Sequence, residues 1–179
     1  MHRRSFLALT AQLAVAATAC SRADETVTAI RLPSLPADPS RWLNSPPLTA
    51  VDLAGRPVLV EFWTYGCSNC RNTLPWMKRI AERHASRGLA IIAVHTPEFD
   101  AERDPAAVRA AIERLAIRYP VLLDPRSDYW DALRNRYWPA FYLFDREHRL
   151  VDTRIGELHA GERRADEFEA RIAALLPAA

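Results

Sequence analysis

The chain has little cysteine and no strong excess of either charge. Three of its 179 residues are cysteines, Cys20, Cys67 and Cys70. A structural zinc site commonly needs a second cysteine pair or a histidine pair, and neither is present. The formal net charge is +2. Because acidic residues are interleaved with the basic ones, the sequence offers no basic footprint for nucleic acid.

Long hydrophobic runs are also scarce. One apolar run, residues 6–19, opens the chain, and it is shorter than the ~20 residues of a membrane span. No later segment is long enough to cross a membrane, and there is no internal repeat. The composition, 49% hydrophobic and 26% charged, suits one globular domain with a full-sized core.

Residues 1–19 predict a secretory signal, because Arg3 and Arg4 precede an apolar run that ends in small residues. The paired arginines resemble a twin-arginine signal. His2 stands where such signals usually have Ser or Thr, so the general secretory route stays open. Cys20 after Thr-Ala resembles a lipoprotein cleavage site, and the same residues fit an ordinary signal peptidase site.

The leader therefore predicts a protein of the periplasm or cell envelope, whose membrane contact would be a lipid on Cys20. Two alternatives stay open, a soluble periplasmic protein with a spare thiol and an uncleaved anchor. A proline-spotted linker is expected over residues 20–39.

The apolar pattern predicts an α/β domain over residues 40–179. Strands are expected at 57–63, 89–95, 121–123, 140–144 and 149–155, and helices at 68–86, 105–115, 128–136 and 162–176. The first two strands enclose a long helix, which implies parallel pairing with a right-handed crossover. The last two strands are so close in sequence that they must form an antiparallel hairpin. We expect a mixed sheet with helices on both faces.

Weaker signals lie between these elements. They predict an edge strand at 26–32, a helical turn at 39–44, a loosely paired strand at 48–53 and a loop at 96–104.

Cys67 and Cys70 lie where a buried strand gives way to a helix. A helix start carries unpaired N–H groups and a partial positive charge, which both favour thiolate over thiol. We therefore expect Cys67 to attack a partner and Cys70 to resolve the mixed disulfide. The alternatives are zinc, which lacks its other ligands, and a structural disulfide, which would stabilise little across so small a loop.

Glu61 is the one charged residue in the apolar strand Val-Leu-Val-Glu-Phe-Trp. Burial of an acid is costly unless the acid has a task. We expect Glu61 to accept and return the proton of Cys70 during exchange. A salt-bridged or edge-exposed glutamate is the alternative.

Pro139 follows a tryptophan just before an apolar strand, which makes it a candidate cis proline. The alternative is a trans proline that ends the preceding helix. Trp63, Tyr65 and Trp138 are candidate walls of a substrate site, although aromatic residues at strand ends are more often core residues.

A set of residues matches the thioredoxin superfamily in order and spacing: Phe62-Trp63, Cys67-x-x-Cys70, Pro75 and Trp138-Pro139. The stretches Phe-Trp-Thr-Tyr-x-Cys-x-Asn-Cys and His-Thr-Pro-Glu-Phe further resemble its exported TlpA/ResA-like branch. They are most similar to the domain at the C-terminus of DipZ-type membrane proteins. The resemblance covers about residues 40–178.

This resemblance implies a thioredoxin-like fold in which the helix after Pro105 is an insertion. It implies that Glu61 is the buried acid of the family. It also implies that Pro139 is the cis proline beside the dithiol, where the preceding backbone pairs with substrate.

The function implied is an exported thiol–disulfide oxidoreductase, with reduction of periplasmic protein disulfides favoured by family analogy alone. The dipeptide Ser68-Asn69 replaces Gly-Pro, so no redox potential is carried over. Thr73 stands where certain cytochrome-maturation members have an acid, which argues against a dedicated haem-thiol reductase. No organic cofactor or metal is implied, and a separate membrane electron-transfer protein would donate electrons.

Two other functions stay open. Thr64 lies three residues before Cys67, as in thiol peroxidases. However, Val60 occupies the position four residues before Thr64 where a proline is expected, and Cys70 is unusually close to Cys67. A copper-delivery module could use both cysteines and a distant histidine such as His95, although a CxxxC spacing would favour it more.

Overall fold

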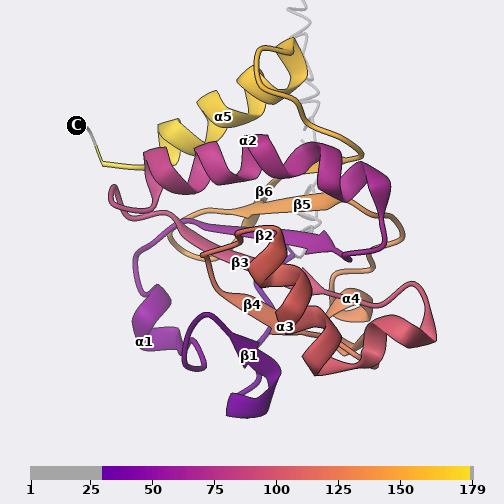
Figure 1. Cartoon of the computed structure of the whole chain (residues 1–179). Helices are drawn as coiled ribbons and strands as arrows, with labels where there is room; N and C mark the ends of the chain where they lie inside the picture. The colour runs from indigo at the N-terminus through magenta and orange to yellow at the C-terminus, as the bar shows by residue number, and fades with distance from the viewer. Residues whose placement is uncertain (1–29, 178–179) are drawn as a thin grey trace, which may run out of the picture.

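The computed structural model describes residues 30–177, so the predicted signal and Cys20 lie outside the described residues. A six-stranded sheet has the order β1-β4-β3-β2-β5-β6 (Figure 1). The strands are β1 (Trp42–Leu43), β2 (Val58–Trp63), β3 (Ala90–His95), β4 (Val121–Leu123), β5 (Ala140–Phe144) and β6 (Leu150–Ile155). The helices are α1 (Ala50–Leu53), α2 (Ser68–His84), α3 (Pro105–Arg114), α4 (Asp128–Ala132) and α5 (Arg163–Leu175). Between residues 30 and 177, no helix is long and apolar enough to span a membrane.

Strand β2 lies inside the sheet and sets its topology. It pairs in parallel with β3 and antiparallel with β5, and β5 pairs antiparallel with β6. The predicted parallel βαβ unit and the C-terminal hairpin are therefore confirmed. Because β5 is antiparallel, its first residue, Ala140, pairs with Phe62 near the end of β2. Pro139 and the loop that follows β2 consequently meet at one edge of the sheet.

Two apolar cores cover the two faces of the sheet. Helices α2, α3 and α5 contribute to the larger core, and α1 and α4 contribute to the other. Helices α2 and α5 run side by side along their face (Figure 1). Successive side chains of a strand point to opposite faces. Glu61 therefore shares the α2 face with Leu59 and Trp63, both members of the larger core.

Two of the expected elements are wrong or too long. The stretch 48–53 is not a paired strand, because residues 50–53 form α1 behind a capping box between Thr49 and Asp52. Helix α4 ends at Ala132 rather than near residue 136. Arg134 has a φ of 52°, and a left-handed residue cannot continue an α-helix.

The weaker signals are partly confirmed. Pro39–Arg41 form a 3-10 turn that leads into β1, and the loop at 96–104 contains a second such turn, Asp100–Arg103. From the expected edge strand at 26–32, Arg31 forms an isolated bridge to Arg149, while 26–29 lie outside the described residues. The linker over 20–39 stays a prediction, and in its described part Leu32 and Leu35 pack on the sheet.

Candidate active site

Cys67 is the N-cap residue of the 17-residue helix α2, and it forms a disulfide with Cys70 whose two Cα atoms are 5.3 Å apart. The Cys70 N–H donates to Cys67 Sγ at 3.1 Å. Cys67 is half-buried, whereas Cys70 is only 4% exposed. The helix start thus directs backbone N–H groups at the sulfur that a partner can reach.

The two residues before Cys67 are held from both sides by charged groups. The Arg71 guanidinium donates to the carbonyl oxygens of Tyr65 and Gly66, each at 2.9 Å. The Gly66 N–H donates to Oε1 of Glu102 at 2.9 Å. A Cβ on Gly66 would overlap this same oxygen. A carboxylate and a guanidinium therefore fix the path of the chain into the dithiol.

Glu102 is a functional candidate that the sequence did not indicate. It is 3% exposed, and its Oε2 accepts the N–H groups of Glu98 at 2.7 Å and Phe99 at 3.2 Å. Burial by itself would raise the pKa of Glu102, but backbone N–H donors and the Thr64 hydroxyl outweigh burial and lower the pKa. The carboxylate stays ionised and joins the Asp100–Arg103 turn to the loop at Gly66.

His95 ends β3 beside this loop and is 2% exposed. Its Nε2 lies 3.2 Å from Thr64 Oγ1, its ring stacks on Tyr65, and the Trp63 ring lies nearly perpendicular to it. Burial lowers the pKa of His95 to about 4, with Glu102 acting in the opposite direction. The imidazole is therefore neutral at neutral pH and serves the packing of the loop.

Glu61 is buried, as the sequence predicts, and is 3% exposed. Burial raises the pKa of Glu61 to about 8, and the Tyr119 hydroxyl partly offsets this rise. Burial and the Glu61 charge raise the pKa of Tyr119 well above its ordinary value. Within residues 30–177 the Tyr119 hydroxyl has no hydrogen bond of ordinary geometry. Glu61 can consequently gain or lose a proton near neutral pH.

The Trp138–Pro139 peptide bond is cis, which confirms the prediction from the sequence. Trp138 is half-buried, and its Nε1 donates to the carbonyl oxygen of Thr96 at 3.1 Å. Trp63 differs, because it is 4% exposed and belongs to the larger core. Of the three aromatic residues expected to line the site, Tyr65 and Trp138 reach the surface and Trp63 supports His95 from below.

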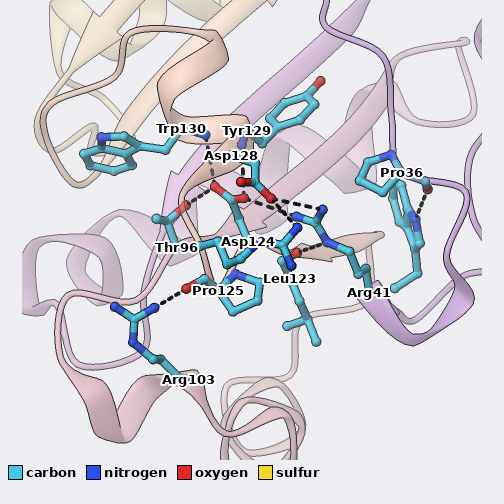
Figure 2. A network of polar contacts seen from close by, with 12 residues as sticks. Pro36, Arg41, Thr96, Arg103, Leu123, Asp124, Pro125, Asp128, Tyr129 and Trp130 are labelled. Carbon is cyan, nitrogen blue, oxygen red and sulfur yellow. Dashed lines mark hydrogen bonds and ion pairs between the residues drawn. The ribbon is translucent and has the colours of Figure 1, made fainter.

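Asp124 organises a polar network with Thr96, Arg41 and the start of α4 that the sequence did not indicate (Figure 2). It is fully buried, and its Oδ2 accepts from Thr96 Oγ1 at 3.1 Å and from the Trp130 N–H at 3.0 Å. Oδ1 accepts from the Tyr129 N–H at 3.0 Å and from Arg41 at 3.2 Å. One carboxylate thus ties the ends of β3 and β4 to α4 and to the N-terminal segment.

No group of three or more His, Cys, Asp or Glu side chains in the described range 30–177 is arranged to hold a metal ion.

Residues 43–153 match the model of the AhpC/TSA family. DipZ of Mycobacterium tuberculosis is 40% identical over 119 residues, which are 65% of this chain and 17% of DipZ. YkuV of Bacillus subtilis, a thiol-disulfide oxidoreductase, is 29% identical over 116 residues, 64% of this chain and 77% of YkuV. The chain therefore spans about a sixth of the length of the DipZ proteins it matches.

Solved structures show the same fold. A thioredoxin-like protein in its oxidised form superimposes with a TM-score of 0.69 at 26% identity, over 82% of this chain and 96% of that protein. A thiol-disulfide isomerase from Corynebacterium glutamicum has a TM-score of 0.69 at 24% identity, over 83% and 98%. The fold is thioredoxin-like, as the sequence predicts.

Proposed function

The chain belongs to the AhpC/TSA family, and from this premise we propose that it is a thiol–disulfide oxidoreductase acting on protein substrates. The observation that carries the proposal is the pair of cysteines at the start of α2. The half-buried Cys67 caps the helix, and its disulfide partner Cys70 is buried. The relatives YkuV and ResA, both named thiol-disulfide oxidoreductases, support the same activity.

The reaction moves two electrons from the dithiol to a substrate disulfide. The Cys67 thiolate attacks one substrate sulfur, the substrate S–S bond breaks, and the first substrate thiolate leaves and takes up a proton. Cys70 then loses its proton, and its thiolate attacks Cys67 Sγ in the mixed disulfide. The second substrate thiolate leaves and is protonated, so the substrate gains two electrons and two protons while the enzyme becomes a disulfide.

Glu61 is the proposed acceptor of the Cys70 proton. It shares the α2 face of the sheet with the core that contains Cys70. Its pKa of about 8 is close to the ordinary thiol value of about 8.5. A proton can pass between two groups of similar pKa in either direction at little cost. Glu61 would therefore serve both the oxidised and the reduced half of the cycle.

The proposed substrate is an extended polypeptide that lies against the cis Pro139 and between Tyr65 and Trp138. These residues lie at the edge of the sheet where the Cys67 loop begins. We propose that the protein acts as a reductase in the periplasm or cell envelope, with a separate membrane electron-transfer protein as donor. A secreted disulfide oxidoreductase of Mycobacterium tuberculosis among its structural relatives supports an exported location. A lipid on Cys20 is part of the same proposal.

The alternatives gain no specific support. A thiol peroxidase would use the Thr64 hydroxyl next to Cys67, but this hydroxyl lies 3.2 Å from His95 Nε2 and also lowers the pKa of Glu102. A copper module would use His95, which is buried against Thr64 and Tyr65.

The decisive experiment measures disulfide exchange with full-length protein carrying Cys20→Ser, so that one dithiol remains. Reduction of insulin should be lost on Cys67→Ser, and Cys70→Ser should accumulate a mixed disulfide. For the Cys67–Cys70 pair, a redox potential of about −270 mV would support a reductase, and one of about −120 mV would support an oxidant. Insulin reduction that survives Cys67→Ser would overturn the proposal.

A further inference from the structure

A shallow groove of about 480 Å³ opens beside the cis-proline turn. Its lining consists of Trp130, Asp131, Arg134, Asn135, Arg136 and Trp138. Trp138 immediately precedes the cis peptide bond, and Ala140 pairs with Phe62. The groove therefore lies at the same edge of the sheet as the loop to Cys67, but its residues take no part in the exchange chemistry.

Two tryptophans among the lining residues form an aromatic pair. The rings of Trp130 and Trp138 lie 4.2 Å apart between centroids. Asp124 accepts the backbone N–H of Trp130 and the hydroxyl of Thr96 (Figure 2). The Thr96 carbonyl oxygen accepts the indole N–H of Trp138. Asp124 thus fixes the backbone of Trp130 directly and reaches the Trp138 indole through Thr96, so a ligand has less ordering of this pair to impose.

Two unpaired guanidinium groups belong to the wall of this groove. Arg134 and Arg136 are exposed, and neither side chain forms an ion pair or hydrogen bond with any residue in 30–177. Many other arginines are paired, such as Arg79 and Arg83 with Glu169. Asp131 is the one acid in the lining, so the groove has an excess of positive charge.

The backbone that carries these guanidiniums is held in place by Asn135. Its Nδ2 donates to the Tyr137 carbonyl oxygen at 3.0 Å, and its Oδ1 accepts from the Tyr142 hydroxyl at 3.0 Å. Arg134 adopts a left-handed φ of 52°, a conformation that costs free energy for a residue with a Cβ. The turn is therefore fixed in a shape that ends α4 and leaves both arginines unpaired.

We propose that this groove docks an acidic stretch of the substrate polypeptide next to its reactive disulfide. The inference rests on the proposed function and names the substrate class of that site. Tryptophan and arginine are the residues in which binding hot spots are enriched, and guanidinium groups recognise carboxylates with paired hydrogen bonds. The indoles of Trp130 and Trp138 contact the apolar part of the stretch, and the two arginines bind its carboxylates. The neighbouring disulfide then lies beside Cys67.

The test compares two cyclic peptides of equal length, each closed by one disulfide. They differ only in the two residues before the first cysteine, which are Asp-Glu in one peptide and Asn-Gln in the other. Reduced wild-type protein should react faster with the acidic peptide, by about tenfold at low ionic strength. The preference should shrink as salt rises, because the screening length is about 8 Å at physiological ionic strength.

The variant Arg134→Gln/Arg136→Gln should bring the rate ratio of the two peptides to within about twofold. Its rate with uncharged hydroxyethyl disulfide should remain that of the wild type, because Cys67 and Cys70 are untouched. The matched control is Arg114→Gln/Arg118→Gln, which removes the same charge near the amino end of β4, at the opposite edge of the sheet. This control should keep the preference for the acidic peptide.

The docking proposal is overturned if the wild type shows no acidic preference, if the Arg134/Arg136 variant keeps it, or if the control loses it equally. A second readout separates docking from chemistry. An acidic peptide with serine in place of both cysteines should quench tryptophan fluorescence, and Arg134→Gln/Arg136→Gln should weaken its binding about tenfold. If the wild type fails to reduce hydroxyethyl disulfide but binds this peptide in that way, the proposed function fails and the docking site stands.

Discussion

Glu61 and Glu102 are both 3% exposed, yet their carboxyl groups respond to burial in opposite directions. The pKa of Glu61 is raised to about 8, because burial is opposed only by the Tyr119 hydroxyl. The pKa of Glu102 is lowered, because the backbone N–H groups of Gly66, Glu98 and Phe99 donate to its two oxygens. The core around Glu61 favours a neutral acid, and the loop around Glu102 favours a charged one.

The difference teaches that exposure alone does not decide the state of a buried acid. The cost of removing a carboxylate from water is offset when N–H donors replace the water. Glu102 has such donors and therefore acts as a fixed anion that shapes the loop. Glu61 lacks them and can therefore gain or lose a proton near neutral pH, as the proposed proton transfer with Cys70 requires.

The largest effect expected from this contrast is on the pH dependence of stability in the variant Glu61→Gln. The folded pKa of Glu61, about 8, exceeds the ordinary value of 4.5. Between these values the folded state holds a proton that the unfolded state has released, so stability falls as pH rises and levels off above pH 8. Glu61→Gln should not show this fall. Between pH 5 and pH 9 its free energy of unfolding should therefore rise by about 3–5 kcal/mol relative to that of the wild type.

Urea denaturation of the oxidised protein at several pH values measures this effect, since the disulfide prevents Cys67 and Cys70 from titrating. The control is Glu82→Gln, a change at an exposed position of α2. If the stability curves of wild type and Glu61→Gln are parallel, the pKa of Glu61 is not raised and the contrast with Glu102 is wrong.

The next largest effect is expected for Glu102→Gln, with the opposite sign. A glutamine amide presents one acceptor oxygen, and its NH₂ group would face N–H donors that now meet the second oxygen. We expect a loss of roughly 2–4 kcal/mol at pH 7. Because the folded pKa is lowered, the contribution of Glu102 is present above pH 4.5 and disappears as pH falls through the folded pKa, so the two curves should converge in acid.

Urea denaturation of wild type and Glu102→Gln at pH 7 and in acid measures whether their free energies of unfolding converge. Glu98→Gln is the matched control, because it changes an exposed glutamate in the same loop. A deficit that persists unchanged in acid would mean that the shape of Glu102, not its charge, holds the loop.

A smaller effect, about 1–3 kcal/mol, is expected for Gly66→Ala. The added Cβ would overlap Oε1 of Glu102. In a Glu102→Ala background the obstacle is gone, so the same change should cost almost nothing, and the double-mutant cycle should return a coupling of about 1–3 kcal/mol. Additive free energies of unfolding would show that Gly66 is required for a reason other than Glu102.

The smallest effect is expected for Tyr119→Phe, which sharpens the account of Glu61. The Tyr119 hydroxyl lowers the Glu61 pKa, so its removal should raise that pKa by roughly 0.5–1 unit, or about 1 kcal/mol. The midpoint of the stability difference between Tyr119→Phe and its Glu61→Gln double variant reports this pKa. Tyr137→Phe, at an exposed tyrosine, should leave the midpoint unchanged. A lower midpoint in Tyr119→Phe would contradict the assignment.

The order of the main elements could be predicted from the sequence, because their signals are local. An apolar run, a CxxC pair and an amphipathic segment follow each other within residues 58–84, and each is visible in a short window. Glu61 stands out for the same reason, as one charge inside an apolar strand. The two differences from the expected elements are local as well: a capping box at Thr49 begins α1, and no residue type in the sequence indicates the left-handed Arg134.

Glu102 and Asp124 could not be recognised in the same way. Glu102 lies in the charged stretch Asp-Ala-Glu-Arg, which reads as solvated surface, and its bond to Gly66 spans 36 positions. Asp124 bonds Thr96 across 28 positions and Arg41 across 83. Most of their partners are backbone N–H groups, which every residue but proline possesses, so no residue type marks them.

The sequence by itself therefore determined the cysteine pair, the helix that begins at it and the acid in the strand before it. Only the tertiary structure decided which carboxylates are charged, which aromatic residues reach the surface and where Arg134 and Arg136 lie. The physical reason is that propensity and amphipathicity act between near neighbours in the chain. The free energy of a buried charge instead depends on donors that distant segments bring together.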